Sequence, residues 1–279
     1  MDQTARNELA IVFGSIALEA GQAIMAVRGS PLELQRKPDG SPVTQADIQA
    51  DRIILQRLTR LLPGIAVVTE EATETHAFGG AGRFILVDPL DGTREFSSGR
   101  DEFTVNIALV EGGAPVAGAV YAPALNRLYL AGAAAFRAEL RPTEAMPELS
   151  AMRTLRTRAV STESLRAVAS HSHLDAATRR WLDARSIEDI RSAGSSLKFC
   201  MIAEGEADVY PRLAPTMEWD TAAGHAVLAA AGGCVVAVDG TPLAYGKSAA
   251  GFRNQPFIAW GTRQCCDSDR ARAMVRDPN

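Results

Sequence analysis

Cysteine is scarce in this chain, which limits the roles that sulfur chemistry could have. Four of the 279 residues are cysteines: Cys200, Cys234, Cys265 and Cys266. None of their spacings is typical of a zinc site, and two adjacent cysteines do not suit a disulfide framework. We interpret all four as reduced thiols.

A surplus of basic residues is also missing. The formal net charge is -4, with 29 lysines and arginines against 33 aspartates and glutamates. Proteins that bind nucleic-acid polymers usually carry a strong positive charge, so we do not expect such a polymer as a partner. If the substrate is an anion, we expect metal ions to supply much of the positive charge.

The first 29 residues lack a basic leader and a small-residue cleavage site, which argues against export. Asp2, Glu8 and Glu19 interrupt the apolar positions, which argues against a membrane span. We therefore expect a cytoplasmic protein. The sequence leaves open a peripheral association with the inner face of a membrane and the formation of a homodimer.

Helix and strand patterns alternate in the first half of the chain. Apolar spacing predicts helices from about Thr4 to Val27 and after Thr44, which forms a capping-box pattern with Asp47. Strand-like runs follow at 65–69, 83–88 and 127–132, together with a hairpin around residues 112–113. This order predicts a sheet with helices.

A second alternation follows a weak stretch at about 137–152. It contains helical patterns near 175–184, after the Gly-Ser-Ser at 194–196 and after Thr216. Strand-like runs lie at 207–212 and 234–238. We therefore expect an α/β protein of stacked layers, with all 279 residues in one unit made of two halves, about 1–140 and 150–279.

The stretch "VDPLDGTREF" places Asp88 and Asp91 three residues apart, directly after an apolar run. Aspartate, proline and glycine are ordinary turn residues, so one interpretation is a surface corner. The other is a metal site, because carboxylates this close repel each other unless a cation lies between them. An EF-hand beginning at Asp88 is excluded, since its twelfth position is Gly99.

The stretch "GTPLAYGKS" is similar in composition to a phosphate-binding loop. Five residues separate Gly240 from Gly246, however, where the motif requires four, and no apolar helix follows. We therefore do not expect nucleotide binding through this loop.

Other carboxylates follow predicted elements in the same way. Glu70 and Glu71 lie at the carboxyl end of a strand, where ligands of α/β sheets gather. Asp220 falls in the first turns of a predicted helix, where the dipole favours an acidic residue with or without a ligand. Taken alone, Asp220 and Asp47 are better explained as helix-start residues.

The motifs taken together carry a family resemblance. "DPLDGT", with "EE" upstream and "WDTAAG" downstream, resembles the magnesium-dependent, lithium-sensitive phosphatases that include inositol monophosphatases and fructose bisphosphatases. "GSPVTQAD", "GAVYAP" and "GSSLKFCMIAEGEADVYPR" resemble the bacterial CysQ branch, the 3'(2'),5'-bisphosphate nucleotidases. The resemblance covers nearly the whole chain but fades between about Ala131 and Ala167 and after Trp260.

The resemblance implies a layered αβαβα sandwich of the inositol monophosphatase and sugar phosphatase type. It also implies two or three Mg²⁺ ions, held by the first half, and a substrate held by the second. The Mg²⁺ ligands it implies are Glu70, Asp88, the Leu90 carbonyl, Asp91 and Asp220. The catalytic residues it implies are Asp47, Glu70 and Thr93. The substrate-binding residues are Gly92, Thr93, Gly194, Ser195, Ser196, Lys198 and Asp220.

The activity implied by the resemblance is Mg²⁺-dependent removal of the 3'-phosphate from adenosine 3',5'-bisphosphate, a step associated with sulfur metabolism. The alternatives are an inositol or sugar phosphatase and an inactive phosphate-binding or regulatory protein. Relatives of the nucleotidase type have arginine in the segment that corresponds to "ASHSHLD". This chain has His171 there, whose charge depends on pH near neutrality, and this departure counts against a nucleotide substrate.

Overall fold

The structure is a computed structural model, and it describes residues 1–28, 35–36, 42–77, 82–159, 164–170, 174–267 and 269. Two sequence expectations fall outside these residues: the end of the first helix at 29–31 and the role of His171. A third, the role of the tail after Trp260, is covered only in part.

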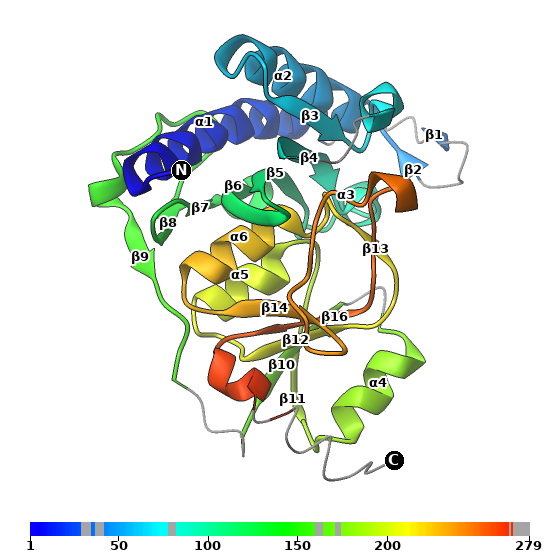
Figure 1. Cartoon of the computed structure of the whole chain (residues 1–279). Helices are drawn as coiled ribbons and strands as arrows, with labels where there is room; N and C mark the ends of the chain where they lie inside the picture. The colour runs from blue at the N-terminus through cyan, green and yellow to red at the C-terminus, as the bar shows by residue number, and fades with distance from the viewer. Residues whose placement is uncertain are drawn as a thin grey trace.

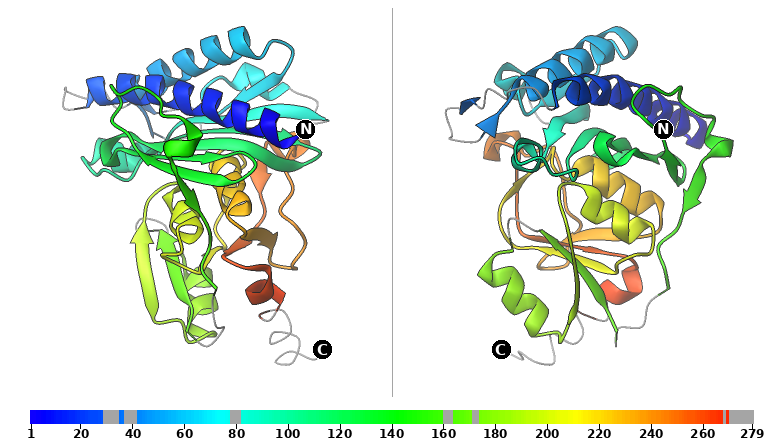
Figure 2. Two further views of the ribbon diagram at one scale, coloured as in Figure 1. Left: turned by 90° about the vertical axis from the view of Figure 1, so that its left-hand side faces the viewer. Right: turned by 180° about the vertical axis from the view of Figure 1, so that it is seen from behind.

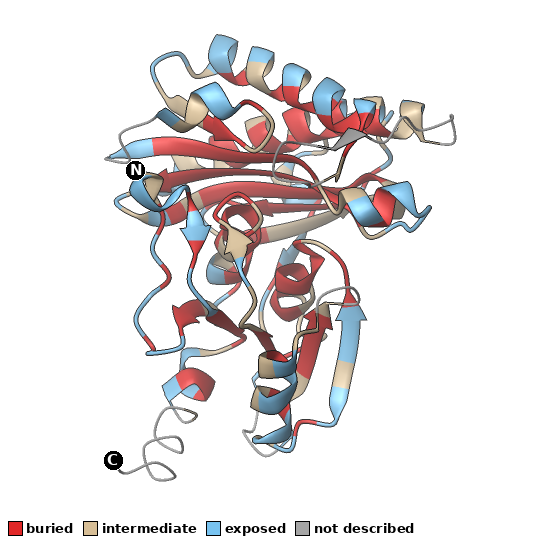
Figure 3. Ribbon diagram, turned by 90° about the vertical axis from the view of Figure 1, so that its right-hand side faces the viewer, coloured by how far each residue is buried: buried red, intermediate tan, exposed pale blue. Residues whose placement is uncertain are grey.

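A seven-stranded sheet forms the upper half of the molecule (Figure 1). Its strands are paired in the order of the sequence; the first pair is parallel and the others are antiparallel. Both faces are covered, so its central strands consist of nearly continuous apolar runs (Figure 3). The strands are β3 (Ala66–Thr69), β4 (Arg83–Asp91), β5 (Thr104–Glu111), β6 (Ala114–Ala122), β7 (Arg127–Ala131), β8 (Ala135–Glu139) and β9 (Arg153–Leu155).

Two long helices, α1 (Gln3–Val27) and α2 (Gln45–Leu61), cover the outer face of this sheet (Figure 1). The helix α2 begins with the predicted capping box, in which Thr44 and Asp47 exchange hydrogen bonds. By length and composition α1 is apolar enough to cross a membrane, but half of its most apolar window is buried inside the molecule. Its buried residues, such as Phe13 and Ile16, join the core between the two helices and the sheet, as in the core helix of a globular protein.

Two short helices, α5 (Leu197–Ala203) and α6 (Ala222–Ala230), lie between the large sheet and a second sheet (Figure 2). Their buried side chains join one core with residues from both sheets. Small residues allow α6 to approach closely, because a Cβ added at Gly118 of β6 would lie 3.3 Å from Ala226 Cβ. This middle layer holds the two sheets in a fixed relation.

The second sheet has five strands in the order β11-β10-β12-β16-β14. The helix α4 (Ala176–Asp183) covers its far side, where Leu182 belongs to one buried cluster with Val209 and Trp260. The layers therefore follow the expected αβαβα order. The strands are β10 (Arg166–Ser170), β11 (Asp189–Ala193), β12 (Val209–Arg212), β14 (Cys234–Ala237) and β16 (Phe257–Trp260).

The remaining elements are short. Two small antiparallel pairs are β1 (Gln35–Arg36) with β2 (Pro42–Val43), and β13 (Thr216–Met217) with β15 (Arg253–Asn254). The helix expected directly after Thr216 begins only at Ala222, because β13 and a turn come first. The 3-10 helices are η1 (Thr73–Ala77), η2 (Pro123–Leu125), η3 (Leu149–Ala151) and η4 (Ser248–Ala250), and α3 (Thr93–Ser97) is a single short helix.

Candidate active site

The acidic residues of the first half gather at one edge of the large sheet because β3 and β4 are parallel and end together. Glu70 follows β3, and its N–H donates to the Val87 carbonyl at 3.1 Å, which extends the pairing by one residue. The register of β4 with β5 shifts between Asp88 and Asp91. Such irregularities redirect side chains next to functional sites, and here both aspartates end up at the strand end.

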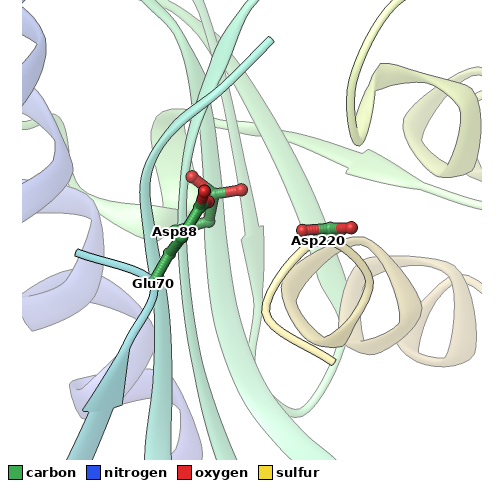
Figure 4. Close-up of side chains that lie close together, drawn as sticks. All are labelled: Glu70, Asp88 and Asp220. Atoms are coloured by element: carbon green, nitrogen blue, oxygen red, sulfur yellow. The ribbon is translucent and has the colours of Figure 1, made fainter. Parts of the chain in front are cut away.

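Three carboxylates converge at this edge (Figure 4). Glu70 and Asp88 come from the large sheet, and Asp220 comes from the turn that precedes α6. One oxygen of each lies within 4.8 Å of the others. Burial raises the pKa of Asp88 well above its usual range, and repulsion from Glu70 and Asp91 raises it further. Burial, followed by repulsion from Asp91 and Glu70, does the same for the pKa of Asp220.

The donors of this cluster suit a hard divalent cation. All of its candidate ligand atoms are carboxylate oxygens, which Mg²⁺ prefers and which do not favour zinc or copper. Burial and mutual repulsion raise the pKa of Asp88 and of Asp220, so both carboxylates take up protons more readily than usual when no cation lies between them. Glu70, Asp88 and Asp220, three of the residues expected as ligands, therefore fit Mg²⁺.

The other two expected ligands have different surroundings. Asp91 Oδ2 accepts hydrogen bonds from Ser195 Oγ at 2.5 Å and from the Ser196 N–H at 2.9 Å, so this oxygen is directed toward the second half of the chain. The Leu90 carbonyl lies 3.3 Å from Thr93 Oγ1. The roles of Asp91 and Leu90 as ligands stay predictions.

Thr93 and Asp47, two of the catalytic residues that the resemblance implies, form a hydrogen-bonded pair. Thr93 Oγ1 donates to Asp47 Oδ1 at 2.9 Å, and the other oxygen of Asp47 accepts from the Thr44 N–H at 2.8 Å and the Thr44 hydroxyl at 2.6 Å. Burial raises the pKa of Asp47, while these hydrogen bonds lower it. Asp47, the acidic member of the capping box of α2, thus also orients the Thr93 hydroxyl.

Gly92 allows the chain to turn sharply before Thr93. Its φ is 97°, in the left-handed region that favours glycine. A Cβ at this position would lie 3.2 Å from both the Glu102 carbonyl oxygen and Phe103 Cβ. The turn therefore needs glycine both for its conformation and for its close approach to the next strand.

Residues 194–196, predicted to bind substrate, make hydrogen bonds within the protein. The Gly194 N–H donates to Glu102 Oε2 at 3.1 Å, and the Ser196 N–H donates to Asp91. Both amides are thus already bonded to carboxylates, which argues against them as donors to a second phosphate. The Ser195 hydroxyl bonds to Asp91 and lies in very short contact with the Thr104 hydroxyl.

Lys198 is buried below the same loop. Its ammonium donates to the Ser195 carbonyl at 2.6 Å, approaches the Ala193 carbonyl at 3.4 Å and lies 5.3 Å from the centre of the Tyr210 ring. Burial lowers the pKa of Lys198 to about 8, although Asp91 opposes this shift. In this geometry Lys198 supports the loop, and a direct contact with substrate stays a prediction.

Comparison with known proteins decides the family. The model of the inositol monophosphatase family matches residues 5–264. The chain belongs to the inositol monophosphatase family. The 3'(2'),5'-bisphosphate nucleotidase CysQ of Salmonella typhimurium is 43% identical over 242 residues, which cover 82% of this chain and 91% of that relative.

Solved structures agree with this family assignment. The crystal structure of CysQ from Bacteroides thetaiotaomicron has a TM-score of 0.80 and 35% identity, and the match covers 92% of this chain and 98% of that one. An inositol monophosphatase of Thermotoga maritima has a TM-score of 0.71 at 24% identity, with 91% and 93% covered, and supports the fold alone.

A cavity of about 250 Å³ lies beside the acidic cluster of this family member. Arg212, at the end of β12, lines it together with Tyr210 and Lys198. Arg212 Nε is buried and has no hydrogen-bond partner in the described part of the chain, while Nη2 approaches the Pro215 carbonyl at 3.3 Å. Sequence reasoning missed Arg212. The sequence did offer a signal, because Arg212 ends the predicted strand "ADVYPR", just as Glu70 and Asp88 lie at the ends of predicted strands.

Proposed function

We propose that the chain is a Mg²⁺-dependent phosphatase that removes the 3'-phosphate from adenosine 3',5'-bisphosphate to give AMP and phosphate. The observation that carries this proposal is the convergence of three buried carboxylates with the Thr93–Asp47 pair at one cavity. Relatives that carry the nucleotidase name and cover most of the chain support the choice of substrate.

Glu70, Asp88 and Asp220 would hold the metal, with Asp91 and the Leu90 carbonyl as further predicted ligands. Bound Mg²⁺ would supply positive charge to the phosphate oxygens and make a water easier to deprotonate. Two or three ions per site, and inhibition by Li⁺, are expectations from the family.

Thr93 is suited to position the attacking water. Its hydroxyl proton is donated to Asp47, so its oxygen can accept a hydrogen bond from a water and orient that water's lone pair toward phosphorus. Glu70 is the predicted second partner of the water. Asp47 is the final proton acceptor in this arrangement, and its raised pKa makes it a better base than an exposed aspartate.

Arg212 is our candidate for binding the second phosphate. Guanidinium groups bind phosphate through two parallel N–H donors, and the buried Nε of Arg212 has no partner among the described residues. Because the amides of Gly194 and Ser196 already donate to carboxylates, we assign the second phosphate to Arg212 rather than to these two predicted substrate-binding residues.

A substrate panel tests the proposal. Phosphate release is measured at fixed Mg²⁺ with adenosine 3',5'-bisphosphate, adenosine 3'-monophosphate and inositol 1-phosphate. We expect kcat/KM for the bisphosphate to exceed that for inositol 1-phosphate by at least about tenfold, or ~1.4 kcal/mol. Arg212→Met should lower kcat/KM for the bisphosphate and leave the 3'-monophosphate nearly unchanged. A preference for inositol 1-phosphate would favour a sugar phosphatase, and the absence of metal-dependent release would favour a regulatory protein.

A further inference from the structure

The loop that is similar in composition to a phosphate-binding loop binds a carboxylate of its own chain. The N–H groups of Gly246 and Lys247 donate to the two oxygens of Glu218 at 2.7 and 2.9 Å. The Lys247 ammonium lies 2.7 Å from Glu218 Oε1. Gly246 has a φ of 94°, so its backbone can present the N–H inward. The anion that this loop holds is therefore Glu218.

Glu218 is an unusual residue to bury. Its side chain is 0% exposed, whereas that of Lys247 is 28% exposed. Burying a carboxylate costs several kcal/mol unless donors and an opposite charge compensate. The loop supplies the N–H donors and the opposite charge. Asp220, two residues further along the chain, is instead repelled by Asp91 and Glu70. This compensation keeps Glu218 fixed in place.

The segment fixed in this way carries Asp220. The Glu218 N–H donates to the Phe252 carbonyl at 2.8 Å, and Asp220 Oδ2 accepts from the Met217 N–H at 2.8 Å. Asn254 Nδ2 donates to the Met217 carbonyl at 2.8 Å, and Lys247 Nζ lies 3.3 Å from Asn254 Oδ1. Lys247 thus reaches two of the groups that hold the turn before α6, and Ser196 Oγ, which donates to the Asp220 carbonyl at 2.8 Å, is a third.

Asp220 needs such support because its position is not set by the sheet that carries the other two carboxylates. Glu70 and Asp88 follow paired strands, while Asp220 lies in a turn between the short strand β13 and α6. We propose that the Glu218–Lys247 ion pair positions Asp220 for metal binding, so that both are positioning residues of the site. This inference rests on the proposed metal-dependent function.

The test compares Lys247→Met with Arg137→Met. Arg137 also pairs with a buried carboxylate, Glu204, at 2.8 Å, but outside the residues that line the cavity. Mg²⁺ affinity is measured by calorimetric titration and by the rise in Tm on adding Mg²⁺, and separately from the Mg²⁺ dependence of phosphate release. We expect Lys247→Met to weaken Mg²⁺ binding by about tenfold or more, as loss of a supporting group around a metal site typically does.

Rescue and control separate positioning from general stability. We expect Lys247→Arg to bind Mg²⁺ nearly as well as the wild type, because it keeps the charge, and Arg137→Met to lose stability without losing Mg²⁺ affinity. If Lys247→Met folds poorly, Glu218→Gln tests the same link, since it keeps the side-chain shape and removes the charge. Wild-type Mg²⁺ affinity in a folded Lys247→Met or Glu218→Gln protein would overturn the positioning role of the ion pair and leave the proposed function standing. A wild-type protein that neither binds Mg²⁺ nor releases phosphate would overturn the proposed function as well.

Discussion

Asp88→Asn should make the metal-free protein more stable while abolishing its activity. The carboxylate is buried beside Glu70 and Asp220, with one oxygen of each within 4.8 Å of the others. Two unit charges 4.8 Å apart repel by about 3.5 kcal/mol at an effective dielectric constant of about 20. Removing one of three such charges removes two of the three repulsions.

The measurable gain is smaller than this sum because the cluster takes up protons to relieve the repulsion. We expect Asp88→Asn to raise the free energy of unfolding by about 1 to 3 kcal/mol in EDTA at pH 8. The substituted amide still offers an oxygen to the Leu90 N–H, which donates to Asp88 Oδ1 at 3.0 Å. The local turn should therefore survive the change.

The sign of the pH dependence follows from the raised pKa of Asp88. Between the usual value of 3.8 and the raised value, the folded metal-free protein binds more protons than the unfolded chain. Its stability should therefore fall as pH rises through this window and level off above it. Asp88→Asn should make this fall shallower, and saturating Mg²⁺ should counteract it in the wild type.

Urea unfolding followed by tryptophan fluorescence measures these effects, with and without Mg²⁺. Asp208→Asn is the matched control, because Asp208 is equally buried but pairs with Arg158 through two hydrogen bonds of 2.7 Å. That variant should lose stability in both conditions. The reasoning would be refuted if Asp88→Asn were less stable than the wild type in EDTA, if Mg²⁺ stabilised it as much as the wild type, or if it kept more than about a tenth of the wild-type kcat, a loss below ~1.4 kcal/mol.

Three further predictions concern water positioning, backbone contact and the metal. Thr93→Ala should lower kcat by about 100-fold or more while the Mg²⁺-induced rise in Tm is kept, and Thr93→Ser should restore turnover; an equal loss of Mg²⁺ affinity would place Thr93 among the ligands. Gly194→Ala should cost about 1 to 3 kcal/mol of unfolding free energy, since its Cβ would lie 2.5 Å from the Glu102 carbonyl oxygen, whereas Gly261→Ala, with 3.4 Å to its nearest neighbour, should cost little. Millimolar Li⁺ should inhibit phosphate release, and insensitivity to it would count against close kinship with lithium-sensitive relatives.

The sequence predicted the elements whose signals are local. The capping box of α2 and the hairpin of β5 and β6 appear where expected, because a cap and a tight turn depend on a few adjacent residues. The strands β10, β11 and β16 were missed. β11 is largely exposed and shows little apolar pattern, so only its pairing with β10 in the sheet makes it a strand (Figure 3).

The acidic part of the site was predictable for a related reason. Glu70 and Asp88 each follow an apolar strand, and once β3 and β4 pair in parallel the two side chains have to meet. Asp220 was harder to place, because a short strand and a turn occupy the positions where a helix was expected. Asp220 lies beside Glu70 and Asp88 only because the layer of α5 and α6 packs between the two sheets.

The hydrogen bonds of the predicted substrate-binding residues 194–196 could not be predicted from the sequence, because they join segments far apart in the chain. Nothing local to residues 194–196 indicates that Glu102 and Asp91 take the amides of Gly194 and Ser196. A glycine-serine turn before a helix therefore looks like an anion site, whereas in the fold it docks the second half onto the first. Arg212 was overlooked although it ends the quoted motif "GSSLKFCMIAEGEADVYPR", because only its place at the cavity, with a buried Nε that has no partner among the described residues, points to a role. Variants with a different substrate preference should accordingly differ at Arg212, whereas substitutions at 194–196 should first weaken the contact between the two halves.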